Sequence, residues 1–446
     1  MLDTNRVTIR DLTIGVVGLG YVGLPTAVGF YDAGFRVRGL DVSSRVIDAL
    51  KAGNNPGDDS SLDGKIPEAS ERWAVSIDPS ELVPSCDVIL VTVPTPVSDN
   101  HKPDLSFVQA AGEAIFDNLR DGVGLDKIVV VLESTVYPGV TREIWSPLLA
   151  DRNLVEGEDV ELAYCPERFV PGDPEHGVRQ VARVVGTSSK DAGEFLVALY
   201  STLTDGGVTH VGAIEVAEAA KVVENVQRDL NIALVNELAL ILPELGLDVE
   251  DVLNAAATKW NFHRYKPGLG VGGHCIPVDP YYLIERAAAA GAPTDLISAA
   301  RAVNSSMPMH VAMRILQLLA DAQLEPTAAT VLLLGWAYKP GIADARETPV
   351  KPLAAALAAA GVKILVWDPY IIPERRPEGP MAFVDDPYRS EPDVVVLCTA
   401  HPEVLALDWA SLRRCSPTGI LYDGRRILDA NEITLAGWSL TSIGTK

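Results

Sequence analysis

The sequence predicts an α/β protein in which two doubly wound, Rossmann-like domains are joined by a central domain of long helices. Short apolar runs alternate with helical patterns in the first half of the chain and again from Thr330 onward. Such alternation is typical of parallel sheets with helices on both faces. Between the two regions, Ala213 to Leu242 has helical apolar spacing with no internal glycine or proline.

The first Rossmann-like domain is predicted over residues 1–207. A strand at Leu12–Val17 leads through a glycine turn into a helix at Val22–Ala33. We expect the later strands to join the first in one parallel sheet. They are predicted at Arg36–Leu40, Asp87–Val93, Lys127–Glu133, Glu161–Tyr164 and Arg183–Val185.

The central domain is predicted over residues 208–325. Its first helix, Ala213–Leu242, is long for a globular protein and is expected to end before Pro243. A helix of this length usually crosses a domain junction or packs against a second subunit. Further helical patterns follow at Val249–Ala257, Tyr281–Ala290 and Pro293–Ala322.

The third domain, residues 326–446, is predicted to hold a smaller doubly wound sheet. An alanine-rich helix at Leu353–Ala360 separates two of its strands. The strands are predicted at Val331–Gly335, Lys363–Trp367, Asp393–Cys398 and Gly419–Tyr422.

The charge balance narrows the classes of partner. The 446 residues include 37 basic and 60 acidic side chains, a net charge of −23. Such a surface repels nucleic acids and anionic membranes, so we expect neither as a partner. An anionic substrate therefore needs a local basic pocket. The N-terminus, Met1–Arg10, lacks the apolar core of a signal peptide, and no run approaches the ~18 apolar residues of a membrane span.

The cysteine pattern indicates the cellular compartment. The five cysteines, at positions 86, 165, 275, 398 and 415, are scattered and form no CxxC pair. Neither a disulfide framework nor a metal site is predicted. Reduced thiols in a cytoplasmic protein fit this pattern best.

A dinucleotide-binding fingerprint, Gly18-Leu-Gly-Tyr-Val-Gly23, follows a predicted strand and opens a helix. Gly18 permits the tight turn, Gly20 lets a pyrophosphate approach the backbone, and Gly23 allows close packing of helix on strand. Tyr21 and Val22 lie in the same turn and are candidate cofactor contacts.

Asp41 ends the second predicted strand, where it is placed to accept hydrogen bonds from a ribose diol. A carboxylate there disfavours the 2′-phosphate of NADP, so NAD is the predicted cofactor. Arg45 nearby is the one feature that argues in the other direction.

Two polar segments follow later strands of the same domain, Thr92-Val-Pro-Thr-Pro96 and Glu133-Ser-Thr135. Ligands of open α/β sheets bind at these strand ends, so the hydroxyls of residues such as Thr95 and Thr135 are candidates for the nicotinamide side of the cleft. Capping of helix N-termini is the alternative, and the sequence leaves both open.

Cys275 stands in the glycine-rich segment Gly268–Asp279, where glycines at 268, 270, 272 and 273 clear its approach. This setting indicates a thiol for covalent chemistry more than a structural cysteine. Lys221 and Asn225 lie four residues apart on the long helix and share a face. They are candidates for proton transfer and oxyanion stabilisation, although alone they would fit a solvated pair equally well.

Several segments resemble, in order and spacing, the UDP-glucose/GDP-mannose dehydrogenase family of NAD-dependent, four-electron oxidoreductases. The resemblance runs from Gly18 to about Arg426. The segments are GLGYVGLP, VPTP, ESTVYPG, PERFVPG, EAAKVVENVQRDLNIALVNE, GVGGHCIPVDP and YKPGIADARETP.

The resemblance implies a role for each matching residue. Cys275 captures an aldehyde and carries a thioester, and Lys221 and Asn225 stabilise oxyanions, with Lys221 also a candidate base. The residues implied to position and activate water are Thr135, Glu167 and Asp279.

The resemblance also implies ligand contacts and a partner. Arg346 closes over the cofactor region, and the central helix forms the core of a homodimer. Tyr338 and Lys339 match residues at the nucleotide end of a UDP-sugar. The further candidate substrate contacts are Glu167, Arg168, Lys221, Asn225, Tyr265, Gly268 and Gly272.

Some positions bear on the substrate. Family members that act on UDP-glucose usually carry lysine where this chain has Val278. His274, Tyr281-Tyr282 and the segment Tyr164–Gly172 resemble the UDP-N-acetylhexosamine branch and favour UDP-N-acetylmannosamine. The implied reaction makes a uronic acid for polysaccharide biosynthesis.

Several alternatives to this function remain open. One alternative keeps the four-electron reaction but takes UDP-N-acetylglucosamine or UDP-glucose as the substrate. A two-electron dehydrogenase would keep Cys275 as a structural residue. A protein of another class would be a non-catalytic sensor of NAD and a nucleotide sugar.

Overall fold

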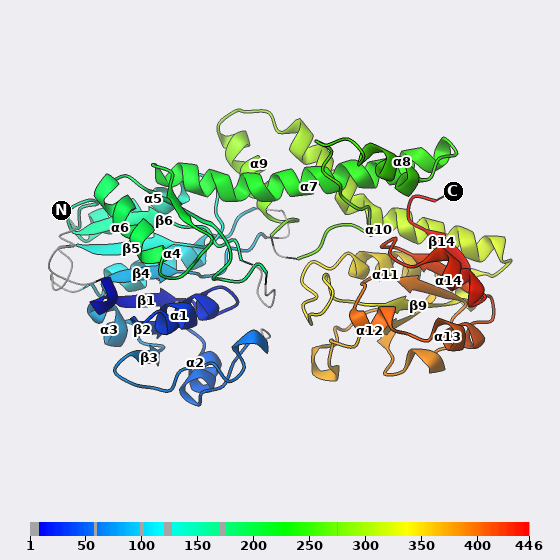
Figure 1. Ribbon diagram of the computed structural model, residues 1–446, viewed down its shortest axis with the longest axis horizontal. Helices are drawn as coiled ribbons and strands as arrows, with labels where there is room; N and C mark the ends of the chain where they lie inside the picture. Colours follow the sequence, from blue (N-terminus) through cyan, green and yellow to red (C-terminus); the bar gives the residue numbers. More distant parts are fainter. Residues whose placement is uncertain are drawn as a thin grey trace. The chain divides into compact units, whose positions relative to one another are not determined.

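The computed structural model describes residues 9–57, 60–98, 102–119, 127–169, 175–273 and 275–445. The chain divides into two compact units (Figure 1). The first comprises Met1–Glu224 and Tyr281–Gly291, and the second comprises Asn225–Pro280 and Ala292–Lys446. The predicted boundaries of three domains stay a prediction.

The described part of the first unit contains an eight-stranded sheet in the order β3-β2-β1-β4-β5-β6-β7-β8. Every strand that was predicted in residues 1–207 lies in this sheet. Its strands are β1 (Thr13–Val17), β2 (Arg36–Leu40), β3 (Trp73–Ser76), β4 (Val88–Val91), β5 (Ile128–Leu132), β6 (Val160–Tyr164), β7 (Arg183–Thr187) and β8 (Val208–His210).

Strand direction departs from the expectation of one parallel sheet. The pairs among β1 to β6 are parallel, but β7 pairs with β6 in the antiparallel direction, and β8 runs parallel to β7. Parallel neighbours need a long crossover, usually a helix, and no helix occurs in the described residues between β6 and β7. An apolar run predicts a buried strand but not its direction.

Helices cover both faces of this sheet, which explains why its central strands are apolar throughout. In β5, Val129 and Val131 join a core with side chains of α1 and α6, whereas Ile128, Val130 and Leu132 join another with α4 and α5. The helices before the central segment are α1 (Gly23–Asp32), α2 (Ser44–Lys51), α3 (Pro79–Leu82), α4 (Ser106–Phe116), α5 (Val140–Asp151) and α6 (Lys190–Tyr200).

The long helix is confirmed as α7 (Ile214–Glu244), which continues from the first unit into the second. Pro243 lies inside its last turn instead of beyond its end, where it removes a single backbone hydrogen bond. The next helices are α8 (Val249–Ala256), α9 (Asp279–Ala289) and α10 (Asp295–Asp321). Within the described ranges, no helix is long and apolar enough to cross a membrane.

The second unit contains a parallel sheet in the order β11-β10-β9-β12-β13-β14. Its strands are β9 (Thr330–Leu334), β10 (Lys363–Trp367), β11 (Met381–Phe383), β12 (Val394–Leu397), β13 (Ile420–Asp423) and β14 (Ser439–Ser442). Its shorter helices are α11 (Val350–Ala359), α12 (Pro402–Leu405), α13 (Trp409–Cys415) and α14 (Ala430–Leu435).

The strand order of the second sheet matches the order β3-β2-β1-β4-β5-β6 in the first sheet. The turns after the corresponding strands β1 and β9 also match. Gly18 and Gly335 follow β1 and β9 with φ of 92° and 91°. Each donates its N–H to the last residue of the next strand, Leu40 or Trp367, at 2.8 Å. Both units therefore hold a doubly wound Rossmann-like sheet, and the predicted fold class is confirmed.

Candidate active site

The glycine turn after β1 has the geometry that a pyrophosphate requires. A Cβ on Gly23 would lie 1.9 Å from the carbonyl oxygen of Gly18, so only glycine lets α1 pack this closely. A Cβ on Gly20 would meet nothing within 4 Å, which leaves the backbone open beside the start of α1. Tyr21 and Val22 are half-buried in the same turn. An open helix N-terminus of this kind fits the phosphates of a dinucleotide.

Asp41 is held in position at the end of β2. Its Oδ2 accepts a hydrogen bond from the N–H of Leu19, and its Oδ1 accepts one from Ser43, each at 2.8 Å. The half-buried carboxylate keeps further acceptor capacity for a ribose diol. Arg45 is exposed on the following helix, α2.

The hydroxyls at the ends of β4 and β5 do not cap α4 or α5, whose N-cap residues are Leu105 and Gly139, and they bond instead to main-chain carbonyls. Thr92 donates to the carbonyl of Gly18 at 2.7 Å, Thr95 to that of Thr135 at 2.8 Å, and Ser134 to that of Val93 at 2.6 Å. These bonds tie the turns after neighbouring strands together. Thr135 itself is half-buried in this layer.

Glu167 lies just beyond the end of β6, and its side chain is nearly buried, at 8% exposure. Burial raises the pKa of its carboxyl to about 7, against the opposing effect of the positive charges of Arg183 and Lys221. Its Oε1 accepts the N–H of Phe169, whereas its Oε2 is buried without a hydrogen-bond partner. A carboxyl that titrates near neutral pH is suited to proton transfer.

Lys221 approaches Glu167 from α7. Its Nζ donates to the main-chain carbonyl of Glu167 at 2.5 Å, so the structure brings these two predicted residues together. Glu218, one turn earlier on α7, accepts hydrogen bonds from Gly139 and Thr141 at the start of α5. This anchoring holds the turn of α7 that carries Lys221.

Arg168 follows Glu167 in the segment after β6. Its guanidinium pairs with Glu224 on α7, and its Nε is buried without a hydrogen-bond partner. The last part of the segment Tyr164–Gly172 and His274 lie outside the described residues.

The second unit assembles a group of residues around the cysteine loop. Gly273 has a φ of 90°, and a Cβ there would lie 2.9 Å from the ring of Tyr338. A Cβ on Gly272 would lie 2.6 Å from the Cβ of Tyr338. The N–H of Gly273 donates to the carbonyl of Arg346 at 3.1 Å. The glycines are therefore required because the loop packs directly on the segment after β9.

Cys275 is half-buried in the turn that leads into α9. Its carbonyl accepts the N–H of Val278 at 3.0 Å and that of Asp279 at 2.8 Å. The carboxylate of Asp279 is buried and accepts a hydrogen bond from the amide of Asn225 on α7. The predicted residues Cys275, Asp279 and Asn225 therefore belong to one local arrangement.

A buried polar chain holds the start of this loop. Gly268 donates its N–H to Asn236 at 2.8 Å, and Asn236 donates to Asn304 at 2.8 Å. Asn304 donates to Asp229, which also pairs with Arg301 at 2.6 Å. Fixed backbone on both sides of a reactive group is what preorganisation requires.

The remaining predicted contacts lie in the same unit. Lys339 is half-buried, and Tyr265 is partly buried against the hydrophobic core. The guanidinium of Arg346 pairs with Asp344 at 2.6 Å.

Three charged residues were missed by the sequence analysis. Arg425 follows β13, and its Nη1 would lie 3.3 Å from a Cβ on Gly268. Burial lowers its pKa, and it is a basic group of the kind an anionic substrate needs. Glu218 and Arg183 are the others. A charged residue inside an otherwise apolar helix or strand was the signal for both.

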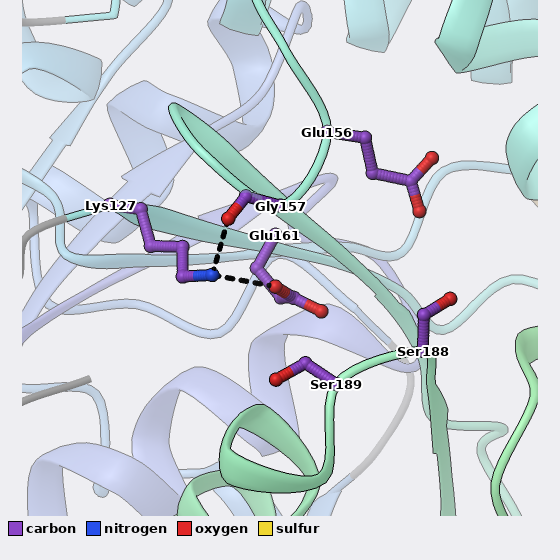
Figure 2. A pocket seen from close by; sticks show the side chains of 6 residues that line it. All are labelled: Lys127, Glu156, Gly157, Glu161, Ser188 and Ser189. Carbon is purple, nitrogen blue, oxygen red and sulfur yellow. Dashed lines mark hydrogen bonds and ion pairs between the residues drawn. The ribbon is translucent and has the colours of Figure 1, made fainter. Parts of the chain in front are cut away.

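A cavity of about 340 Å³ lies elsewhere in the first unit (Figure 2). None of the predicted site residues lines it. Lys127 at one side of it donates to the carbonyl of Gly157 at 2.7 Å and pairs with Glu161 at 3.1 Å. No cluster of three His, Cys, Asp or Glu side chains that could hold a metal ion occurs in the part of the chain that the structure describes.

A glycine turn open to a pyrophosphate, followed by a carboxylate held for a ribose, defines a dehydrogenase that uses a dinucleotide cofactor. Models of the UDP-glucose/GDP-mannose dehydrogenase family match most of the chain. The NAD binding domain matches residues 12–204, the central domain residues 215–306, and the UDP binding domain residues 332–430. The chain belongs to this family and is an NAD-dependent nucleotide-sugar dehydrogenase.

Individual relatives agree with this assignment. The chain is 38% identical to UDP-N-acetyl-D-glucosamine 6-dehydrogenase of Pseudomonas aeruginosa, over 96% of this chain and 100% of that one. It is 32% identical to UDP-N-acetyl-D-mannosamine dehydrogenase of Pyrococcus horikoshii, over 94% and 96%. A solved UDP-D-ManNAc dehydrogenase structure from Pyrococcus horikoshii matches with a TM-score of 0.87 at 31% identity, covering 97% and 99%. The predicted family, enzyme class and NAD cofactor are confirmed, and the sensor alternative has no support.

Proposed function

We propose that this dehydrogenase oxidises the C6 hydroxyl of a UDP-N-acetylhexosamine to the uronic acid, with Cys275 carrying the intermediate. The observation that carries the proposal is the position of the half-buried Cys275 in the turn that leads into the Asn225–Asp279 pair. The names of the two relatives share a UDP group and an acetamido sugar and differ in the epimer. The acetamido class is therefore proposed, with UDP-N-acetylmannosamine and UDP-N-acetylglucosamine as its two candidates.

The cofactor site of the proposal is the turn after β1. Bound NAD supplies the hydride acceptor for both oxidations. The open backbone at Gly20 and the fixed carboxylate of Asp41 fit its pyrophosphate and ribose. The residues proposed to hold it are Gly18, Gly20, Tyr21, Val22, Gly23, Asp41, Arg45, Thr95, Thr135 and Arg346.

In the first oxidation the C6 hydroxyl loses a proton and a hydride and becomes an aldehyde. Glu167 accepts the proton, directly or through water, because its carboxyl titrates near neutrality. Lys221 is held by the carbonyl of Glu167, and its remaining N–H groups stabilise the developing oxyanion.

Cys275 makes the second oxidation possible at the same site. Its sulfur bonds to the aldehyde carbon, and a proton goes to the oxygen, which forms a thiohemiacetal. Loss of a second hydride and a proton produces a thioester. Water then attacks the carbonyl carbon and the C–S bond breaks, which releases the acid and returns the thiol. Asn225 stabilises the oxyanions, and Asp279 and Thr135 are proposed to position this water.

The UDP end of the substrate requires positive charge in a strongly acidic protein. Lys339 and Arg425 supply it in the second unit, beside Tyr338 and the loop at Gly268 and Gly272. Arg168 and Tyr265 complete the proposed substrate contacts.

A homodimer through α7 is part of the proposal. Val216, Val223, Leu234 and Ile241 are each about half exposed and recur at spacings of seven and eleven residues, which places them on one face of α7. An apolar stripe of this kind is typical of a covered surface. Light scattering should report a dimer for the native chain and a monomer for the double variant Leu234→Glu/Ile241→Glu.

Two further assignments accompany the function. The five cysteines all lie among the described residues and none of them forms a disulfide, which supports the cytoplasm, where the uronic acid would supply polysaccharide biosynthesis. The division into domains at residues 1–207, 208–325 and 326–446 is also proposed. The three family matches support it, since each falls inside one of these ranges.

The yield of NADH per UDP-sugar tests the function. We expect two NADH per sugar on an acetamido substrate, with the preferred epimer identified by kcat/KM on both. Two NADH on UDP-glucose alone would keep the mechanism and overturn the substrate class. A single NADH would mean that Cys275 is structural. Cys275→Ser should abolish acid formation with NAD binding intact, and unchanged turnover would contradict its role.

A further inference from the structure

A charged cluster lies buried beside Glu167 in the first unit, and the proposed mechanism does not use it. Arg183 at the start of β7 lies 3.7 Å from Oε1 of Glu133, and neither side chain has exposed area. The Tyr200 hydroxyl donates to the same oxygen at 2.5 Å, and its ring lies 5.3 Å from the Arg183 guanidinium carbon. The Arg183 Nη1 lies 4.0 Å from the sulfur of Cys165.

This cluster is an unfavourable way to fill a core. Two buried charges cost more than a well-packed apolar set of the same volume would. The contacts within the cluster also leave Nε and Nη2 of Arg183 and Oε2 of Glu133 buried without hydrogen-bond partners. A buried pair that is not optimised for stability points to another use for its charge.

The antiparallel direction of β7 places the charge of Arg183 near Glu167. The antiparallel ladder pairs Ala163 with Thr187 and Tyr164 with Gly186. Because β6 and β7 run in opposite directions, the start of β7 at Arg183 and the segment after β6, which holds Cys165 and Glu167, lie at the same edge of the sheet. In a parallel β7, the residue that starts the strand would lie at the other edge of the sheet.

The charges that face Glu167 come from three elements. Arg183 on β7 and Lys221 on α7 favour the ionised carboxylate and lower its pKa, whereas burial and Glu133 at the end of β5 raise it. Arg183 in turn faces Glu133, Glu167, Cys165 and Tyr200. Burial raises the pKa of Cys165 to about 12 and that of Tyr200 as well, so both stay neutral near pH 7. Arg183 is therefore a permanent positive charge in this layer.

We propose that Arg183 is a positioning residue, anchored by Glu133 and Tyr200, whose buried positive charge favours the carboxylate form of Glu167, the proposed proton acceptor. The inference rests on the proposed function, because it assigns Glu167 a part in the reaction. It adds a group that acts through Glu167 without touching the substrate.

The pH profile of kcat tests the proposal. Arg183→Met should move the acid limb up by about one pH unit or more, the usual effect of an opposite charge at close range, and should retain most of the high-pH plateau. Lys127→Met is the matched control, since it removes the Lys127–Glu161 pair at the amino ends of β5 and β6 (Figure 2). It should leave the limb in place. An acid limb that does not move in Arg183→Met, together with an unmoved midpoint in the direct titration of Glu167 described below, would overturn the proposal.

A second variant covers the case in which Arg183→Met does not fold. Glu133→Gln removes the negative charge that opposes ionisation of Glu167 and keeps Arg183. Its acid limb should move to lower pH, opposite to Arg183→Met. A limb that stays in place or moves upward in Glu133→Gln would contradict the proposal.

A direct titration separates this inference from the proposed function. The carboxyl band of Glu167 in difference infrared spectra is identified by its absence in Glu167→Gln. A midpoint that rises in Arg183→Met supports the role of Arg183 even if kcat does not follow, in which case it is the catalytic part of Glu167 that fails. A midpoint that stays in place overturns the inference.

Discussion

The ammonium group of Lys221 donates a hydrogen bond to the main-chain carbonyl of Glu167, which ties α7 to the segment after β6. Only one of the three N–H donors of a lysine is used in this bond. The bond fixes where the ammonium lies and leaves two donors for an oxyanion. Lys221 is thereby oriented by the backbone of the residue proposed to take the first proton.

Replacement of Lys221 should separate chemistry from cofactor binding. We expect Lys221→Met to lower kcat by about 10²–10³-fold, the usual effect of removing one preorganised donor from an oxyanion. The dissociation constant of NAD, measured by calorimetry, should change little. Lys190→Met on the exposed surface of α6 is the control. An equal loss of NAD affinity would assign Lys221 to the cofactor instead.

Replacement of Asp279 should stall the reaction at the thioester. We expect Asp279→Asn to retain both hydride transfers and to slow hydrolysis, because the carboxylate proposed to position water is gone. Intact-protein mass spectrometry after mixing with substrate and NAD should then detect an acyl-enzyme on Cys275. Asn225→Leu removes the amide that donates to the buried carboxylate of Asp279 and should also lower stability by about 1–3 kcal/mol. If hydrolysis in Asp279→Asn proceeds at the native rate, Asp279 does not act on the water.

The buried carboxyl of Glu167 should reduce stability at neutral and higher pH. Burial raises its pKa from 4.5 to about 7, so the folded state binds the proton more tightly than the unfolded state. Its contribution to stability therefore falls as pH rises from the unfolded pKa through the folded one.

The neutral variant Glu167→Gln makes this penalty measurable. In the protein without ligands it should be more stable than the native chain at pH 8, by up to about 3 kcal/mol, and the difference should shrink toward pH 4. Denaturant unfolding at both pH values checks this. Glu68→Gln, at an exposed position, should show no such trend. A Glu167→Gln variant less stable at pH 8 would contradict the assigned pKa shift.

Asp41 should determine the preference for NAD over NADP. Its carboxylate is held by the N–H groups of Leu19 and Ser43, so a 2′-phosphate would meet a fixed negative charge. We expect Asp41→Ala to weaken NAD binding about 10-fold or more and to raise the ratio of NADP to NAD activity. The two kcat/KM values measure the ratio. An unchanged ratio would mean that Asp41 only supports the turn.

Local patterns predicted most of the fold. The apolar runs located strands of both sheets, and the glycines of the turn at Gly18–Gly23 identified the dinucleotide site, because a tight turn needs specific backbone freedom wherever it occurs. The short strands β3, β8, β11 and β14 were not predicted. Their few residues carry little periodicity.

Part of the candidate site could also be predicted, because some of its residues lie close together in the sequence. Motif spacing identified Cys275 and Asp279 within one loop, and the structure adds that Asn225 bonds to Asp279. The role predicted for the hydroxyls after β4 and β5 stays a prediction, and the structure adds that Thr92 and Ser134 donate to main-chain carbonyls. A hydroxyl finds its acceptor among residues brought close only by folding.

The sequence by itself determined the fold class, the NAD turn, the family and the glycine-rich loop around Cys275, since each depends on motifs of residues close together in the chain. Only the tertiary structure decided the direction of β7, and with it the pairing of Arg183 with Glu133 and its place at the same sheet edge as Glu167. These relationships join residues 16 to 50 positions apart, from 167 to 183 and from 133 to 183. Burial and strand register bring such residues together, and no local pattern records either.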